Sequence, residues 1–173
     1  MIEYVIERLA SNVPEALKAL LSANRTLVPM PKSAPFPPKE SNVLWVPRRI
    51  AEVLAARGLG GPVRALLVRS TAVQKSAYAE PGGRPTTKAH FDSLRVEKIV
   101  DPPEAFTIVD DVITRGATLL AAASRLRETY PLAEIDCFAL VRTRGLVAEI
   151  DKIEDPAVGT IRRNSSGEAD RQP

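Results

Sequence analysis

Residues 106–118 read FTIVDDVITRGAT, an apolar run that ends in two carboxylates and a short loop. The run 106–109 predicts a buried strand, with Asp110 and Asp111 at its carboxyl end, where open parallel sheets bind ligands. The loop 114–118 then opens a helix, whose first turn offers free backbone N–H groups and the positive end of the helix dipole. The stretch therefore predicts acceptors for hydroxyl groups beside a phosphate cradle, which together suit a phosphorylated sugar.

This stretch resembles the phosphoribosyl diphosphate (PRPP) signature of the type I phosphoribosyltransferases. In that pattern, four apolar residues, two acids and two apolar residues precede Thr-Thr-Gly-x-Thr. The matching residues here are Asp110, Asp111, Thr114, Gly116 and Thr118. Two acids after a strand would mean little alone, but the whole pattern between a predicted strand and a predicted helix is specific.

The resemblance implies an α/β fold with a mostly parallel twisted sheet flanked by helices. It implies that Asp110 and Asp111 bind the ribose hydroxyls of PRPP and a Mg²⁺ ion, directly or indirectly, and act in catalysis. It also implies a set of residues that bind the 5-phosphate: Thr114, Arg115, Gly116, Ala117 and Thr118. Arg115 stands where the family has a second Thr; it either adds a phosphate contact or points away, and the sequence does not decide.

A second part of such a site is expected at the Pro29–Ser33 turn, which follows a predicted strand over 26–31. In the family, a loop at this place holds the diphosphate, which implies that role for Met30, Lys32 and Ser33. The alternative is a proline-rich surface turn with a solvated lysine. Charge-assisted hydrogen bonds to phosphate contribute roughly 1.5–3 kcal/mol each, which favours the binding role.

Residues 70–92 are rich in Gly, Pro and polar groups and predict a long loop, which in a compact domain is usually functional or disordered. In the family, a loop here closes over the site and excludes water. Its cations are Lys75, Arg84 and Lys88; the resemblance implies that Arg84 and Lys88 reach the diphosphate and that Arg84 aids catalysis. The alternative is that these side chains are simply solvated.

A narrower similarity points to the competence-type (ComF-like) phosphoribosyltransferase-domain proteins. It rests on the order of the 29–31 turn and several later residues: Asn42, Arg69, Gln74, Arg84 and Phe91. Thr87 stands where that branch has Asn. The Cys-rich zinc module that often precedes the core is absent, and the helical segment 2–23 replaces it.

The apolar periodicity predicts helices over 2–10, after Pro14, from Pro47 to Gly58 and over 117–129. It predicts strands over 63–68, 94–100 and 135–141, and a small docking helix through Leu146, Val147, Ile150 and Ile153. We divide the chain into an N-terminal helical segment and candidate hood (1–25), a phosphoribosyltransferase core (26–143), a C-terminal extension (144–163) and a flexible tail (164–173).

Composition narrows the function classes. The 173 residues carry a net charge of +3 and only 5% aromatic residues, so neither nucleic-acid binding nor a stacking platform is indicated. The sequence lacks a membrane span and a secretion signal, and Cys137 reads as a reduced core thiol, so we expect a cytoplasmic protein. His90 reads as a loop or packing residue rather than a catalytic base.

The leading hypothesis is a transferase that moves 5-phosphoribose from PRPP to a nitrogen acceptor, such as a nucleobase, and releases diphosphate. The partners are then PRPP and an unidentified small acceptor, with no membrane and a homodimer as an option. One alternative is a catalytically silent regulator that binds PRPP or a nucleotide. The other is a DNA-uptake or repair accessory protein. The sequence shows no readable pocket for the acceptor.

Overall fold

The computed structural model describes residues 2–35, 44–73, 85–144 and 156–172. It is a mixed α/β structure, as predicted. Its elements in chain order are α1 (Ile2–Ser11), α2 (Glu15–Lys18), β1 (Thr26–Pro29), α3 (Val46–Ala56), β2 (Leu67–Arg69), α4 (Thr87–Asp92), β3 (Leu94–Val96), β4 (Ala105–Ile113), α5 (Ala117–Thr129), β5 (Glu134–Arg142), β6 (Thr160–Arg163) and β7 (Ala169–Gln172).

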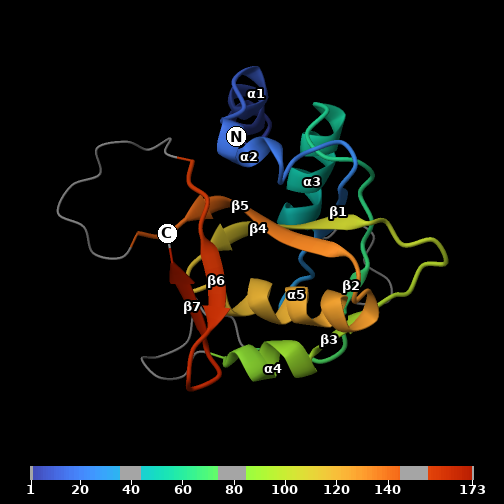
Figure 1. Ribbon diagram of the computed structural model, residues 1–173, viewed down its shortest axis with the longest axis vertical. Helices are drawn as coiled ribbons and strands as arrows, with labels where there is room; N and C mark the ends of the chain where they lie inside the picture. Colours follow the sequence, from blue (N-terminus) through green and yellow to red (C-terminus); the bar gives the residue numbers. More distant parts are fainter. Residues whose placement is uncertain (1, 36–43, 74–84, 145–155, 173) are drawn as a thin grey trace.

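The central sheet has three parallel strands in the order β1-β4-β5. β2 pairs with β3, and β6 with β7, each as an antiparallel pair. α1 and α3 lie on one side of the central sheet, and α4 and α5 lie on the other (Figure 1). The β6–β7 hairpin crosses the end of the sheet where β4 and β5 finish (Figure 1).

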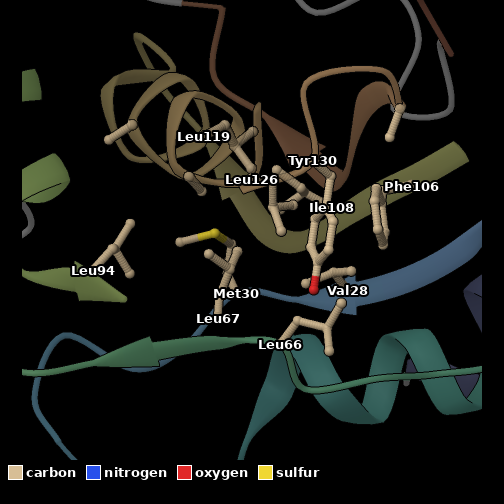
Figure 2. Packing of buried hydrophobic residues seen from close by; sticks show 13 residues of the cluster. Val28, Met30, Leu66, Leu67, Leu94, Phe106, Ile108, Leu119, Leu126 and Tyr130 are labelled. Carbon is tan, nitrogen blue, oxygen red and sulfur yellow. The ribbon is translucent and has the colours of Figure 1, made fainter. Parts of the chain in front are cut away.

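Each face of the sheet packs its own apolar core, because successive side chains of a strand alternate between the faces. Val28, Phe106 and Ile108 face α5 and join the larger core, part of which is drawn in Figure 2. Leu27 and Val109 face the other way and pack with residues of α1, α2 and α3. The run from Ala105 to Val109 is fully buried, which is why this segment reads as continuously apolar.

Several predicted elements are confirmed with small shifts. α3 has Pro47 in its first turn, and Gly58 follows its end at φ 73°, a backbone conformation that glycine adopts without strain. α5 covers 117–129 as predicted, and β5 extends the predicted 135–141 by one residue at each end.

Four expectations were wrong. The predicted strand 63–68 reduces to β2 and an isolated bridge between Leu27 and Val63, and the predicted strand 94–100 is only the short β3. The predicted loop 70–92 ends in α4, which the Thr86 side chain caps by accepting from the Ala89 N–H at 3.1 Å. Residues 164–173 were expected to fray, but β7 pairs with β6. The predicted docking helix through Leu146, Val147, Ile150 and Ile153 lies outside the described residues.

The N-terminal segment is fastened to the sheet through Arg25, whose side chain is buried. Its guanidinium donates to the Thr107 hydroxyl at 3.0 Å and to the Phe106 carbonyl at 3.3 Å. It also pairs with Glu134, at 3.1 Å, and with Asp136 at the start of β5. Arg25 therefore ties the end of the candidate hood 1–25 to the amino ends of β4 and β5, while α1 and α2 pack beside α3 on the face of the sheet that carries Leu27 and Val109.

We expect Arg25→Met to lower the free energy of unfolding by about 2 kcal/mol, because hydrogen bonds to a charged donor are lost in the interior. The control is Arg57→Met, which removes a pair with Glu7 whose two side chains are about half exposed. Such surface pairs contribute less than about 1 kcal/mol. Urea denaturation of both variants measures the difference, and equal losses would contradict the structural role of Arg25.

Candidate functional site

The predicted diphosphate turn and the two acids lie side by side at the carboxyl edge of the sheet. The Met30 N–H donates to the Val109 carbonyl at 2.8 Å, which continues the β1–β4 pairing past the end of β1. The next residue on β4 is Asp110. The two sequence features, far apart in the chain, are therefore adjacent in space, as predicted from the parallel arrangement.

The turn after β1 is held in place by three donors from other segments. Trp45 Nε1 donates to the Met30 carbonyl at 2.6 Å, Arg69 Nε to the Lys32 carbonyl at 3.1 Å, and the Val73 N–H to the Ser33 carbonyl at 2.7 Å. Met30 differs from its predicted role as a diphosphate ligand. Its side chain is buried in the core (Figure 2), and its N–H is already used by β4. Lys32 and Ser33 keep their candidate role, since both are only partly buried.

Asp110 and Asp111 lie within β4, which continues to Ile113, rather than after its end as predicted. Both residues are half-buried, and the Asp111 N–H donates to Asp110 Oδ1 at 2.9 Å. Burial and the nearby Asp111 carboxylate raise the pKa of Asp110 to about 8, against the smaller opposing effects of the Asp111 N–H and Arg69. The Asp110 carboxyl is therefore mainly protonated at neutral pH.

Arg69 is the buried cation next to the acids. Its guanidinium donates to the Ser93 hydroxyl at 2.5 Å and to the His90 carbonyl at 3.5 Å, besides the Lys32 carbonyl. Burial lowers the pKa of Arg69, while the attraction of Asp110 acts in the opposite direction. Arg69 was expected only as part of the narrower resemblance, and its position between the Pro29–Ser33 turn and α4 was missed.

The predicted phosphate loop turns into α5 at Gly116. This residue has φ 88° and is the N-cap of α5, where no side chain caps the helix in the described structure. Thr114 and Arg115 are exposed, whereas Ala117 and Thr118 are partly buried. The exposed Arg115 is consistent with either of the two roles left open for it. An anion at this point would meet the uncapped first turn of a thirteen-residue helix.

The β6–β7 hairpin covers this loop. Methyl groups of Ile161 lie 2.9 Å from the position that a Cβ on Gly116 would take. Glu168 accepts from the N–H and the hydroxyl of Thr87 on α4, at 3.0 and 3.2 Å. Arg171 donates to the Thr143 carbonyl at 2.6 Å, just after β5. These contacts make the hairpin a wall of the site, which the prediction of a flexible tail missed.

A signal for this hairpin was present in the sequence. Asn164 starts an Asn-Ser-Ser-Gly turn, and its side-chain oxygen accepts from the N–H groups of Ser166 and Glu168, each at 3.0 Å. Gly167 follows at φ 83°, the conformation that glycine supplies in hairpin loops. An Asn and a Gly separated by two polar residues are typical of a turn that can join two strands.

The remaining predicted residues are placed differently from expectation or not described. Lys88 lies on α4 instead of a loop, where its Nζ pairs with Asp92 at 2.5 Å on an exposed surface. Its predicted contact with a diphosphate finds no support in this position. Arg84, Lys75 and Gln74 lie outside the described residues, as does Asn42.

His90 is buried on α4, as expected for a packing residue, but it also contacts the start of α5. Its Nε2 lies 3.4 Å from the Thr118 hydroxyl oxygen. Burial and Arg69 lower the pKa of His90 to about 4, with Glu168 acting in the opposite direction. The imidazole is therefore neutral at physiological pH.

Metal-ligating residues are sparse in the part of the chain that the structure describes. It contains no cluster of three or more His, Cys, Asp or Glu side chains that could hold an ion. Asp110 and Asp111 supply two carboxylates, which is the number that Mg²⁺ commonly takes from a protein when substrate phosphates supply further ligands. Cys137 on β5 is a free thiol, and burial raises its pKa to about 12.

No helix within the described ranges is long and apolar enough to cross a bilayer. A scan of the sequence against protein-family models finds no match, and a search of curated proteins finds no similar sequence.

We expect Gly116→Ala to lower the free energy of unfolding by about 2–3 kcal/mol, from the left-handed backbone strain and the clash with Ile161. The matched control is Gly58→Ala, which has φ 73° but no atom within 4 Å of the added Cβ, and should cost about 1 kcal/mol. Adding Ile161→Ala to Gly116→Ala should remove the clash component. Equal losses of unfolding free energy for the two single variants would show that Ile161 does not pack against Gly116.

Proposed function

We propose that this chain is a PRPP-dependent phosphoribosyltransferase with the type I fold, which transfers 5-phosphoribose to a nitrogen acceptor and releases diphosphate. The observation that carries the proposal is the hydrogen bond from Met30 to Val109. It sets the turn at 29–33 directly beside Asp110, while the loop at 114–118 leaves the same strand. Donors for two phosphate groups then flank a pair of acids, as a sugar with phosphates at both ends requires.

Binding energy in this proposal comes from the two ends of PRPP. The uncapped first turn of α5, with Thr114, Gly116, Ala117 and Thr118, receives the 5-phosphate through backbone N–H groups and hydroxyls. Lys32 and Ser33 meet the diphosphate. The carboxylates of Asp110 and Asp111 accept from the ribose hydroxyls between them. Holding both ends fixes the sugar and positions its C1 atom for attack.

The chemical step needs no covalent nucleophile from the protein. The bond from C1 to diphosphate breaks, diphosphate leaves with the electron pair, and the acceptor nitrogen forms the new bond and loses its proton. Positive charge grows on the ribose ring meanwhile, and the negative field of Asp110 and Asp111 stabilises it. Mg²⁺, when bound by these two acids, would neutralise the diphosphate and help it to leave.

The ionisation of Asp110 links substrate binding to charge. With its pKa at about 8, the free carboxyl carries a proton for most molecules at pH 7. A nearby cation favours the ionised form of a carboxyl, so binding of a magnesium–PRPP complex is expected to release this proton. The buried Arg69 beside it favours the same form. The Mg²⁺ ion of the complex would thus stabilise the ionised form of Asp110.

We expect PRPP with Mg²⁺ to raise the melting temperature, because a ligand that binds only the folded state stabilises it. At a hundredfold excess over Kd the gain is about 2.7 kcal/mol, and each kcal/mol shifts the midpoint by roughly 2–4 °C. Asp111→Asn should reduce this shift while leaving the free protein nearly unchanged, since Asn can still accept from the Val112 N–H.

The matched control is Asp101→Asn, the same change at an exposed residue before the amino end of β4, which should keep the full shift. Absence of any shift in the wild-type protein at millimolar PRPP would refute the proposal. A large loss of stability in free Asp111→Asn would instead assign Asp111 to the architecture of β4.

Transfer itself is tested by measuring diphosphate release with a panel of nucleobases, other heterocyclic nitrogen bases and amines. We expect release to depend on both PRPP and one class of acceptor, and Asp111→Asn to reduce it by at least tenfold. Asp101→Asn should behave as wild type. Tight PRPP binding without diphosphate release for any acceptor would show a regulator that binds PRPP but does not transfer its phosphoribose group.

A further inference from the structure

His90 is the single histidine of the chain, and among the described residues it is one of seven buried polar or charged side chains, with 6% of its surface exposed. Its Nε2 lies 3.4 Å from Thr118 Oγ1, and among the described residues its Nδ1 has no hydrogen-bond partner. Buried polar atoms are nearly always paired, so an orphaned ring nitrogen calls for a reason. An apolar side chain would fill the same space without that cost.

The two neutral tautomers of the ring differ in the direction of the hydrogen bond between His90 and Thr118. If Nδ1 carries the proton, a buried N–H has no acceptor, and Nε2 must accept the Thr118 hydroxyl proton. If Nε2 carries it, Nε2 donates to Thr118 Oγ1, and Nδ1 is left as an unpaired acceptor. Orphaned buried N–H donors are rarer than under-satisfied acceptors, which favours the second form.

We propose that His90 is a positioning residue for the 5-phosphate: it donates from Nε2 to Thr118 Oγ1 and so leaves the Thr118 hydroxyl proton free to bind a phosphate oxygen. This role rests on the proposed function, in which Thr118 contacts that phosphate. A threonine hydroxyl has one proton to donate, so the partner on its acceptor side decides where that proton points.

The surroundings keep the ring neutral and fixed. Arg69 on β2 donates to the His90 carbonyl, and Glu168 on β7 holds the start of α4 through Thr87. Burial and the charge of Arg69 outweigh Glu168 and lower the pKa of His90 to about 4. A neutral ring has a single N–H donor, so the tautomer decides the direction of the hydrogen bond to Thr118.

The tautomer can be measured directly. Because the chain has one histidine, the ¹⁵N chemical shifts of its imidazole need no assignment by mutation. At pH 7 we expect the pattern of the Nε2–H tautomer in the intact protein, and the Nε2 resonance should shift when ribose 5-phosphate is added. The Nδ1–H pattern would overturn the proposal, because Nε2 would then take the hydroxyl proton.

Binding tests use two probes that separate the ends of PRPP: ribose 5-phosphate and inorganic diphosphate. His90→Leu should raise the Kd for ribose 5-phosphate roughly five- to tenfold, the effect of one lost hydrogen bond, and leave the Kd for diphosphate unchanged. His90→Gln, whose amide N can reach the place of Nε2, should recover most of the affinity. In a Thr118→Val background, His90→Leu should add less than about a twofold loss.

The outcomes separate this role from the proposed function. An unchanged Kd for ribose 5-phosphate in His90→Leu overturns the role of His90 and leaves the transferase proposal intact. Equal losses for both probes, without recovery in His90→Gln, show a purely structural residue and also overturn it. If the wild-type protein binds neither probe nor PRPP, the proposed function fails, and the role of His90 fails with it.

Discussion

The buried guanidinium of Arg69 is the interaction on which the candidate site depends. It ties together the turn after β1, the end of α4 and the start of β3, through the Lys32 carbonyl, the His90 carbonyl and the Ser93 hydroxyl. Its positive charge also favours the ionised form of Asp110. A desolvated cation in the interior is costly unless it is paired, so these acceptors hold the three segments in one arrangement.

Much of the framework could be predicted from local sequence. The apolar run before Asp110 marks the central strand, and the periodicity after Gly116 gives α5 with the bounds that the structure has. Pro47 marks the start of α3 and Gly58 follows its end, because Pro is favoured in the first turn of a helix and Gly just after the last turn. These signals are carried by neighbouring residues, and tertiary contacts do not override them.

The parts that could not be predicted depend on partners distant in sequence. Arg69 looks like any strand-end arginine until Lys32 and Ser93 are placed beside it. The polar segment after Asn164 reads as a frayed end because the Glu168 contact with Thr87 spans 81 residues. The strand before Asp110 was predicted to end too early for a similar reason. Pairing with β5 extends β4 through Asp110 and Asp111, although acidic residues have low strand propensity.

The contacts of the β6–β7 hairpin also have a consequence for the order in which parts of the chain fold. A ribosome releases the chain from its amino end, so the sheet, α5 and the loop at Gly116 can form before residues 160–172 have emerged. Only then can Ile161 reach Gly116 and Glu168 reach Thr87. Because these contacts join segments far apart in the chain, we expect them to form late in folding. The loop at Gly116 is therefore specified by neighbouring residues, and we expect its cover to be added last.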